Sequence, residues 1–225
     1  MKSIGMLVAV EISSVLSRYG GEGRKEFKNG FNVYNYETED YTLHVVNSGV
    51  GELAAAAATQ MLIDTYNVEL VVNFGVVGGL TADMAQCRTC IVEKIVHYDF
   101  DLSQIDPVPV GKYPDYEDIF IPTDEKLFKR ALEIEPDLKP VICASADKFV
   151  GTTEGKKKLH ELYGAEICEM EAAGIALSCN RCKVPLLSVK TVSDSIDGGA
   201  DEFYAAVTES SAICLEITEK IIKEL

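Results

Sequence analysis

Short runs of apolar residues, separated by polar segments and by stretches of helical period, recur along the whole chain. Runs that are apolar almost throughout are typical of strands covered on both faces. Such strands are expected at 4–10, 70–74, 91–96, 140–145 and 186–192. Two further segments alternate apolar and polar residues around an acidic turn, which predicts a pair of strands at 31–36 and 41–46.

Apolar residues that recur every three or four positions predict the helices. Helices are expected after the glycine turn 48–51, and at 123–133, 153–163, 169–179 and 201–225. The segment 153–163 is rich in lysine and is expected on the surface. Loops are expected at 75–79 and at 103–118, because the first is rich in glycine and the second carries prolines without a clear period.

Strands and helices alternate without a break in composition, a linker or an internal repeat. A chain of 225 residues is long enough to bury one large core. We therefore expect a single α/β domain over residues 1–225. It has three layers, in which helices flank a central mixed, largely parallel sheet.

The charge of the chain limits its partners. Lysine and arginine number 21 against 36 aspartates and glutamates, which gives a net charge of −15. Such a surface repels nucleic-acid polymers and anionic membranes, so neither is expected as a partner, whereas a single nucleoside is not excluded. The first apolar run lacks the basic flank and the cleavage site of a signal peptide, so a cytoplasmic location with reduced cysteines is expected.

Two C-x-x-C pairs, Cys87/Cys90 and Cys179/Cys182, raise the alternative of a zinc site. Zinc ribbons join such pairs over a short spacer, but here the spacer is long and Cys179 lies on the apolar face of a predicted helix. Buried or half-buried thiols are the favoured interpretation. Neither a metal nor a cofactor is expected.

The candidate chemistry gathers in residues 168–203. Asp194 follows the apolar run 186–192, and a carboxylate at the carboxyl end of a buried strand lies where open α/β sheets bind ligands. Glu169 and Glu171 begin the helix that precedes this strand. Each acid has a structural alternative: Asp194 as a turn or capping residue, and the glutamates as acids that complement a helix dipole. Three acids in one unit of helix and strand favour a site.

The same region carries a resemblance to a known family. It contains E-M-E-A at 169–172, V-P at 184–185, S-D at 193–194 and D-E-F at 201–203, preceded by V-N-S-G-V-G at 46–51 and N-F-G-V-V-G-G-L at 73–80. In this order the segments resemble the 5′-methylthioadenosine/S-adenosylhomocysteine nucleosidases of the nucleoside phosphorylase/nucleosidase superfamily. The resemblance implies an enzyme that cleaves the N-glycosidic bond of a purine nucleoside, foremost by hydrolysing these two substrates to adenine and the thioribose. It also implies a homodimer with the segment 103–118 at its interface.

The resemblance implies a role for the matching residues. Asp194 would deliver a proton toward N7 of the base. Glu171 would bind the ribose hydroxyls, since a carboxylate can accept from two vicinal hydroxyls. The further substrate-binding candidates are Met170 beneath the sugar, Phe149 stacked on the purine, Val150 with its backbone at the base edge, and Glu169, Ser193, Gly75 and Val76.

Three positions depart from the family pattern. The acid that activates the attacking water falls on Ser13, and Glu11 could replace it only if the loop shifts by about two residues, roughly 6 Å of extended chain. Asp194, Ser13 and Glu11 are therefore the candidate catalytic residues. Val76 stands where the family usually has a serine, and Lys190 where it has an arginine. A cation near Asp194 would favour its ionised form, against the role of a proton donor.

Two alternatives stay open. Without the water-activating acid, the enzyme could be a purine nucleoside phosphorylase that uses phosphate as the nucleophile. A phosphate site is typically built from arginines, and only Arg18 and Arg24 lie near the first strand. The chain could also be a non-catalytic nucleoside-binding protein that retains Phe149, Met170 and Glu171.

Overall fold

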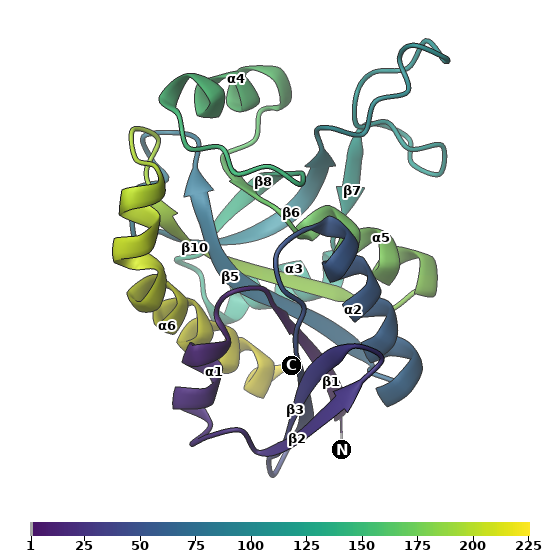
Figure 1. The fold of residues 1–225 in the computed structure, drawn as a ribbon, viewed down its shortest axis with the longest axis vertical. Coiled ribbons are helices and arrows are strands. Elements are labelled where there is room, and N and C mark those ends of the chain that lie inside the picture. Colours follow the sequence, from purple (N-terminus) through teal and green to yellow (C-terminus); the bar gives the residue numbers. More distant parts are fainter. Residues whose placement is uncertain (1) are drawn as a thin grey trace.

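The computed structural model describes residues 2–225, and within this range ten strands form one mixed sheet that helices cover (Figure 1). The strands are β1 (Lys2–Val8), β2 (Arg24–Lys28), β3 (Phe31–Glu37), β4 (Tyr41–Asn47), β5 (Leu70–Gly79), β6 (Thr89–His97), β7 (Phe120–Pro122), β8 (Lys139–Ser145), β9 (Ile167–Glu169) and β10 (Leu186–Asp194). The helices are α1 (Ile12–Arg18), α2 (Glu52–Tyr66), α3 (Glu125–Ile134), α4 (Thr153–Tyr163), α5 (Ala172–Cys182) and α6 (Ala200–Glu224).

The sheet has an open arm and a closed part. Its order is β10-β6-β8-β9-β5-β1-β4-β3-β2, and an additional pairing of β10 with β5 closes the first five strands into a ring. The pairs β1–β4, β1–β5, β5–β10, β6–β8 and β8–β9 are parallel. The pairs β2–β3, β3–β4, β5–β9, β6–β7 and β6–β10 are antiparallel. The expected mixed sheet is confirmed, with more antiparallel pairing than expected.

Alternate residues of the central strands pack into two separate cores, which accounts for the layers. On β1, Leu7 packs into one core with residues of α2 and α5. Its neighbours Met6 and Val8 pack into the other core with residues of α1, α3 and α6. Because successive side chains of a strand point to opposite faces, the sheet lies between two helical layers. The expected three-layer α/β fold is therefore confirmed.

Several predicted boundaries are wrong, and two of the errors bear on the site. Residues 75–79 continue β5 as a strand that is buried at every position, and do not form a loop. Glu169 ends β9, so the helix expected from 169 begins at Ala172. The segment 103–118 is a loop of turns and bends, as expected, and it projects from the body of the molecule (Figure 1). Among residues 2–225 no helix has the length and apolar character of a membrane span.

Candidate active site

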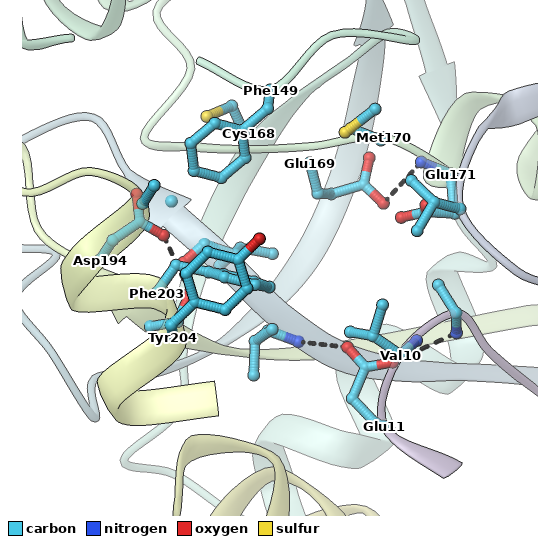
Figure 2. A pocket seen from close by; sticks show the side chains of 17 residues that line it. Val10, Glu11, Phe149, Cys168, Glu169, Met170, Glu171, Asp194, Phe203 and Tyr204 are labelled. Atoms are coloured by element: carbon cyan, nitrogen blue, oxygen red, sulfur yellow. Dashed lines mark hydrogen bonds between the residues drawn. The ribbon is translucent and has the colours of Figure 1, made fainter. Parts of the chain in front are cut away.

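A pocket of about 380 Å³ lies where the ends of β1, β5, β9 and β10 approach the start of α6 (Figure 2). Its lining combines buried carboxylates with aromatic and aliphatic side chains. The lining residues are Ala9, Val10, Glu11, Val50, Val76, Val77, Gly78, Phe149, Cys168, Glu169, Met170, Glu171, Ser193, Asp194, Ala200, Phe203 and Tyr204. Most of the residues expected from the sequence are thus brought together.

Asp194 lies at one end of this pocket, as the last residue of β10, and is 1% exposed. The Ser193 hydroxyl donates to its Oδ1 at 2.9 Å. The Lys156 ammonium donates to its Oδ2 at 2.5 Å. Both carboxylate oxygens of Asp194 are therefore held, one by a hydroxyl and one by an ion pair.

Lys156 was expected on the surface of a lysine-rich helix, and this expectation is wrong. It is completely buried, and its ammonium also donates to the carbonyls of Ser195 at 2.5 Å and Gly198 at 3.1 Å. These bonds tie α4 to the loop that follows β10. In the sequence, the apolar Leu159 indicates that Lys156 is buried. Residues three apart share a helix face, and Leu159 is buried as well.

Glu11 enters the pocket directly after β1. Its Oε2 accepts hydrogen bonds from the backbone N–H groups of Ala9 at 3.2 Å and Val10 at 3.0 Å. Its Oε1 accepts from the N–H of Val76 at 3.0 Å. A Cβ on Gly75 would lie 2.7 Å from this oxygen, so the glycine is what lets the carboxylate approach β5. Gly75 and Val76 thus lie at the site through their backbones.

Ser13 does not line this pocket. It lies on α1 and lines a different hollow, together with Thr208 and Ala212 of α6. The strand β1 ends at Val8, two residues before the predicted end, so the turn that follows presents Glu11. The pocket carboxylate near β1 is therefore Glu11.

Glu169 and Glu171 lie side by side at the end of the pocket away from Asp194 (Figure 2). Glu169 Oε2 accepts from the N–H groups of Glu171 at 3.1 Å and Ala172 at 2.9 Å, so it caps α5 as the structural alternative supposed. Glu171 Oε1 accepts from the Gly51 N–H at 2.9 Å, and no donor within residues 2–225 is hydrogen-bonded to its Oε2. Burial, and then the charge of Glu169, raises the pKa of Glu171 to about 7.

Lys190 pairs with Glu169 at 3.5 Å, with both side chains 3% exposed. Burial alone would lower the pKa of Lys190, but the surrounding carboxylates, Glu169 foremost, raise it. The cation that was expected to act on Asp194 thus neutralises Glu169, while Lys156 is the cation on Asp194.

Aromatic rings form part of the pocket wall. Phe149, 47% exposed, meets the ring of Phe203 edge-on with centroids 5.9 Å apart. Met170 lines the same pocket, and Val150 lines a small recess beside it. Tyr204 is exposed at the rim, and no motif in the sequence marks it as a pocket residue. Phe203, in contrast, belongs to the D-E-F segment.

The charges of the lining limit what it can hold. Over residues 2–225 it carries four carboxylates and no lysine or arginine. No group of three or more histidine, cysteine, aspartate or glutamate side chains in that range is placed to hold a metal ion. Cys87 is exposed and Cys179 is buried, both as free thiols. The pocket therefore suits an uncharged or cationic polar ligand with an aromatic part.

The chain belongs to the phosphorylase superfamily, because residues 8–225 match the model of that family. The aminodeoxyfutalosine nucleosidase of Helicobacter pylori is 30% identical, over all of this chain and 98% of that protein. The 5′-methylthioadenosine/S-adenosylhomocysteine nucleosidase of Buchnera aphidicola is 30% identical, over 76% of this chain and 75% of that protein. The expected family and the expected class of enzyme, an N-glycosidase, are thereby confirmed.

The fold agrees with a solved relative over its full length. The crystal structure of Helicobacter pylori 5′-methylthioadenosine/S-adenosylhomocysteine nucleosidase with butyl-thio-DADMe-Immucillin-A superposes with a TM-score of 0.93. The match covers all of this chain and 99% of that chain at 28% identity.

Proposed function

We propose that the protein hydrolyses the N-glycosidic bond of a 6-aminopurine nucleoside, with 5′-methylthioadenosine and S-adenosylhomocysteine as its foremost substrates. The observation that carries this proposal is the separation of carboxylates in one pocket. Asp194 and Phe149 lie at one end, and Glu11 and Glu171 lie at the other (Figure 2). A purine with its ribose has the same two-part character, an aromatic base and a polyhydroxylated sugar.

Each carboxylate has a place in the reaction. The bond between C1′ and N9 breaks, and the base leaves neutral if Asp194, protonated beforehand, gives its proton to N7. Glu171 accepts hydrogen bonds from the ribose hydroxyls, and the buried carboxylates stabilise the positive charge that develops on the sugar. Water forms the new bond to C1′ and gives its proton to Glu11, which three backbone N–H groups hold in place.

Phosphate is the less favoured nucleophile. A phosphate site is built from arginines or lysines, whereas the charged side chains in the described lining of this pocket are all negative. Glu11 lies where the nucleophile would have to bind, and its charge would repel phosphate. The relatives described above are also named as nucleosidases.

The 5′ substituent is the less restricted part of the substrate. Val10, Val50 and Tyr204 line the pocket and are 42%, 53% and 75% exposed, so its mouth is apolar and open. An aminodeoxyfutalosine-type nucleoside is therefore a second candidate, supported by the names of two relatives.

A homodimer in the cytoplasm is part of the proposal. The projecting loop 103–118 exposes Ile105 at 84%, and α2 exposes Leu53 at 83%. Side chains of this kind are unfavourable in water and suit contact with a second copy. The seven cysteines are free, which suits a reducing compartment.

The test is release of free base from each candidate nucleoside, measured chromatographically with and without phosphate. Hydrolysis predicts adenine release that does not depend on phosphate. Release only with phosphate would identify a phosphorylase. Binding without release, measured by calorimetry, would identify a nucleoside-binding protein.

A further inference from the structure

The hydroxyl of Ser145 lies between two buried carboxylates. Ser145 ends β8 and is completely buried. Its Oγ is 2.5 Å from Glu169 Oε1 and is also hydrogen-bonded to Glu52 Oε1. The same oxygen accepts a hydrogen bond from the N–H of Ala173 at 3.1 Å. Glu52 is the first residue of α2 and is 5% exposed.

Ser145 has too few hydrogens to donate to both Glu52 and Glu169 if both are ionised. A serine hydroxyl has one hydrogen to donate and two lone pairs, of which the Ala173 N–H takes one. It can donate to only one of the two carboxylates. The other contact is a hydrogen bond only if that carboxyl carries a proton of its own. One of Glu52 and Glu169 is therefore a neutral acid.

The remaining contacts identify which acid is neutral. Glu169 accepts from the N–H groups of Glu171 and Ala172 and faces the Lys190 ammonium, all of which stabilise a negative charge. Among residues 2–225, the Glu52 carboxyl accepts, apart from Ser145, only from the Gly174 N–H. The charge thus belongs on Glu169 and the proton on Glu52.

We propose that Glu52 is a positioning residue that stays protonated in the folded protein and, through Ser145, holds Glu169 and Glu171 at the pocket. The protonated carboxyl donates to Ser145, and Ser145 donates to Glu169. Glu169 in turn fixes the backbone of Glu171. A second link runs from the neighbouring Gly51, whose N–H holds the Glu171 side chain. The start of α2 therefore sets the position of the acid that faces the ribose, a part of the inference that rests on the proposed function.

The surroundings of Glu52 are negative on almost every side. Asp147, after β8, accepts from the Glu52 backbone N–H at 2.7 Å, and the charges of Glu169 and Glu171 act on its side chain. Tyr113 of the long loop interacts electrostatically with Glu52, and Lys190 pairs with Glu169. Burial, and then the charge of Glu169, raises the pKa of Glu52 to about 8.

The sign of the pH effect follows from this raised pKa. A free glutamate has a pKa of about 4.3, so between about pH 4.3 and 8 the folded protein binds a proton that the unfolded chain has lost. The contribution of Glu52 to stability is fully present below that range. It is lost as the pH rises through it. The unfolding equilibrium constant increases by up to about tenfold per pH unit from this group.

Glu52→Gln tests the proposal, because an amide has the shape of the neutral acid and can donate to Ser145 while accepting from Gly174. Urea unfolding is measured from about pH 5 to 9 in the parent, in E52Q and in E125Q. Glu125 is the matched control, since it is the first residue of α3 and is exposed. We expect E52Q to equal the parent near pH 5 and to exceed it increasingly toward pH 8, with no such trend in E125Q. A loss of stability in E52Q that is the same at every pH would overturn the proposal.

Two further measurements separate positioning from mere packing. At about pH 6 the infrared carbonyl band of protonated carboxyls, to which Glu171 also contributes, should be weaker in E52Q than in the parent by the share of one acid. If the band is unchanged, Glu52 is not the protonated acid. Above about pH 8, KM for the nucleoside should rise in the parent relative to E52Q, with kcat changing less. An equal rise in both proteins would remove Glu52 as a positioning residue. The unfolding and infrared measurements use no substrate, so they stand or fall separately from the proposed reaction.

Discussion

The ammonium of Lys156 lies 2.5 Å from Oδ2 of Asp194, and both side chains are buried, at 0% and 2% exposed. The pair joins α4 to the end of β10, residues that are 38 positions apart in the chain. One partner of this pair is the acid that is proposed to serve the leaving base. Breaking the pair therefore tests its contribution to both stability and turnover.

Lys156→Met removes that cation and leaves Asp194 without the partner that holds its Oδ2. The kcat should change, because the acid is no longer fixed in its position. The stability at neutral pH should fall by about 3–5 kcal/mol, as for other buried pairs that lose one partner. Lys157→Met is the matched control, because Lys157 is the exposed neighbour on the same helix. A kcat of K156M equal to that of the parent would show that the pair is structural only.

Asp194→Asn should lower kcat by about 10²–10⁴, the usual contribution of a general acid, while nucleoside binding largely persists. It also leaves Lys156 without its anionic partner. Adding K156M to D194N should therefore restore part of the lost stability and none of the lost turnover. A stably folded D194N with parental kcat would remove Asp194 from the mechanism.

An assay of base release also distinguishes the role of the Glu11 carboxylate from that of the Ser13 hydroxyl. Glu11→Gln should reduce phosphate-independent base release by about 10²–10⁴, because the water loses its base. Ser13→Ala, and equally Ser13→Glu, should leave kcat within about twofold, since position 13 faces α6 outside the pocket. A gain of activity in S13E would show that this residue does reach the water.

The sequence predicts best those elements that have capping or terminating residues at both ends. The helix expected at 153–163 is α4 itself, since the Thr152 side chain caps its start and Gly164 ends it with a left-handed backbone. The glycines of 75–79 misled the prediction, because they were taken for loop formers. They lie in a buried strand where side chains approach closely: Glu11 at Gly75, and Asp194 and Cys168 at Gly78.

The site is predictable where motifs carry it and not where distant residues meet. The E-M-E-A and S-D segments identified Glu171 and Asp194, and both line the pocket. Lys156 and Glu52 carry no motif, because their partners lie far along the chain and their burial depends on tertiary packing. The choice between Ser13 and Glu11 depended on where β1 ends, and strand ends are only weakly marked by sequence.

The proposed dimer makes the loop 103–118 sensitive to charge. Ile105→Asp places a carboxylate on the most exposed apolar side chain of this loop. We expect light scattering at micromolar concentration to give a dimer for the parent and a larger monomer fraction for I105D, with a higher KM. Lys112 of the same loop is half-buried, with its ammonium on backbone carbonyls, so it does not serve as a control. Leu162→Asp, at an exposed position of α4, should leave the dimer intact. A monomeric parent would contradict the proposal.

Glu171 should be the residue that distinguishes ribosides from 2′-deoxyribosides. Its Oε1 is taken by the Gly51 N–H, so the carboxylate has capacity left for the sugar hydroxyls. Glu171→Gln should reduce kcat/KM for the riboside by about tenfold or more, as expected for a lost bond to a charged acceptor. The same change should affect the 2′-deoxyriboside much less. Equal losses on both substrates would make Glu171 a structural residue.

The pKa of Glu171 gives this preference a pH dependence. Because burial raises it to about 7, the fraction of Glu171 that is ionised, and hence the better acceptor, grows as the pH rises from about 6 to 8. KM for the riboside should fall over this range, while KM for the 2′-deoxyriboside stays nearly constant. Stability changes in the opposite sense, since a carboxyl with a raised pKa contributes most below about pH 4.3 and loses that contribution as the pH rises through 7. Binding that strengthens while urea stability declines over the same pH range is expected for the parent. In E171Q the change in binding should be absent and the decline in stability should be shallower, because only the contribution of Glu52 remains.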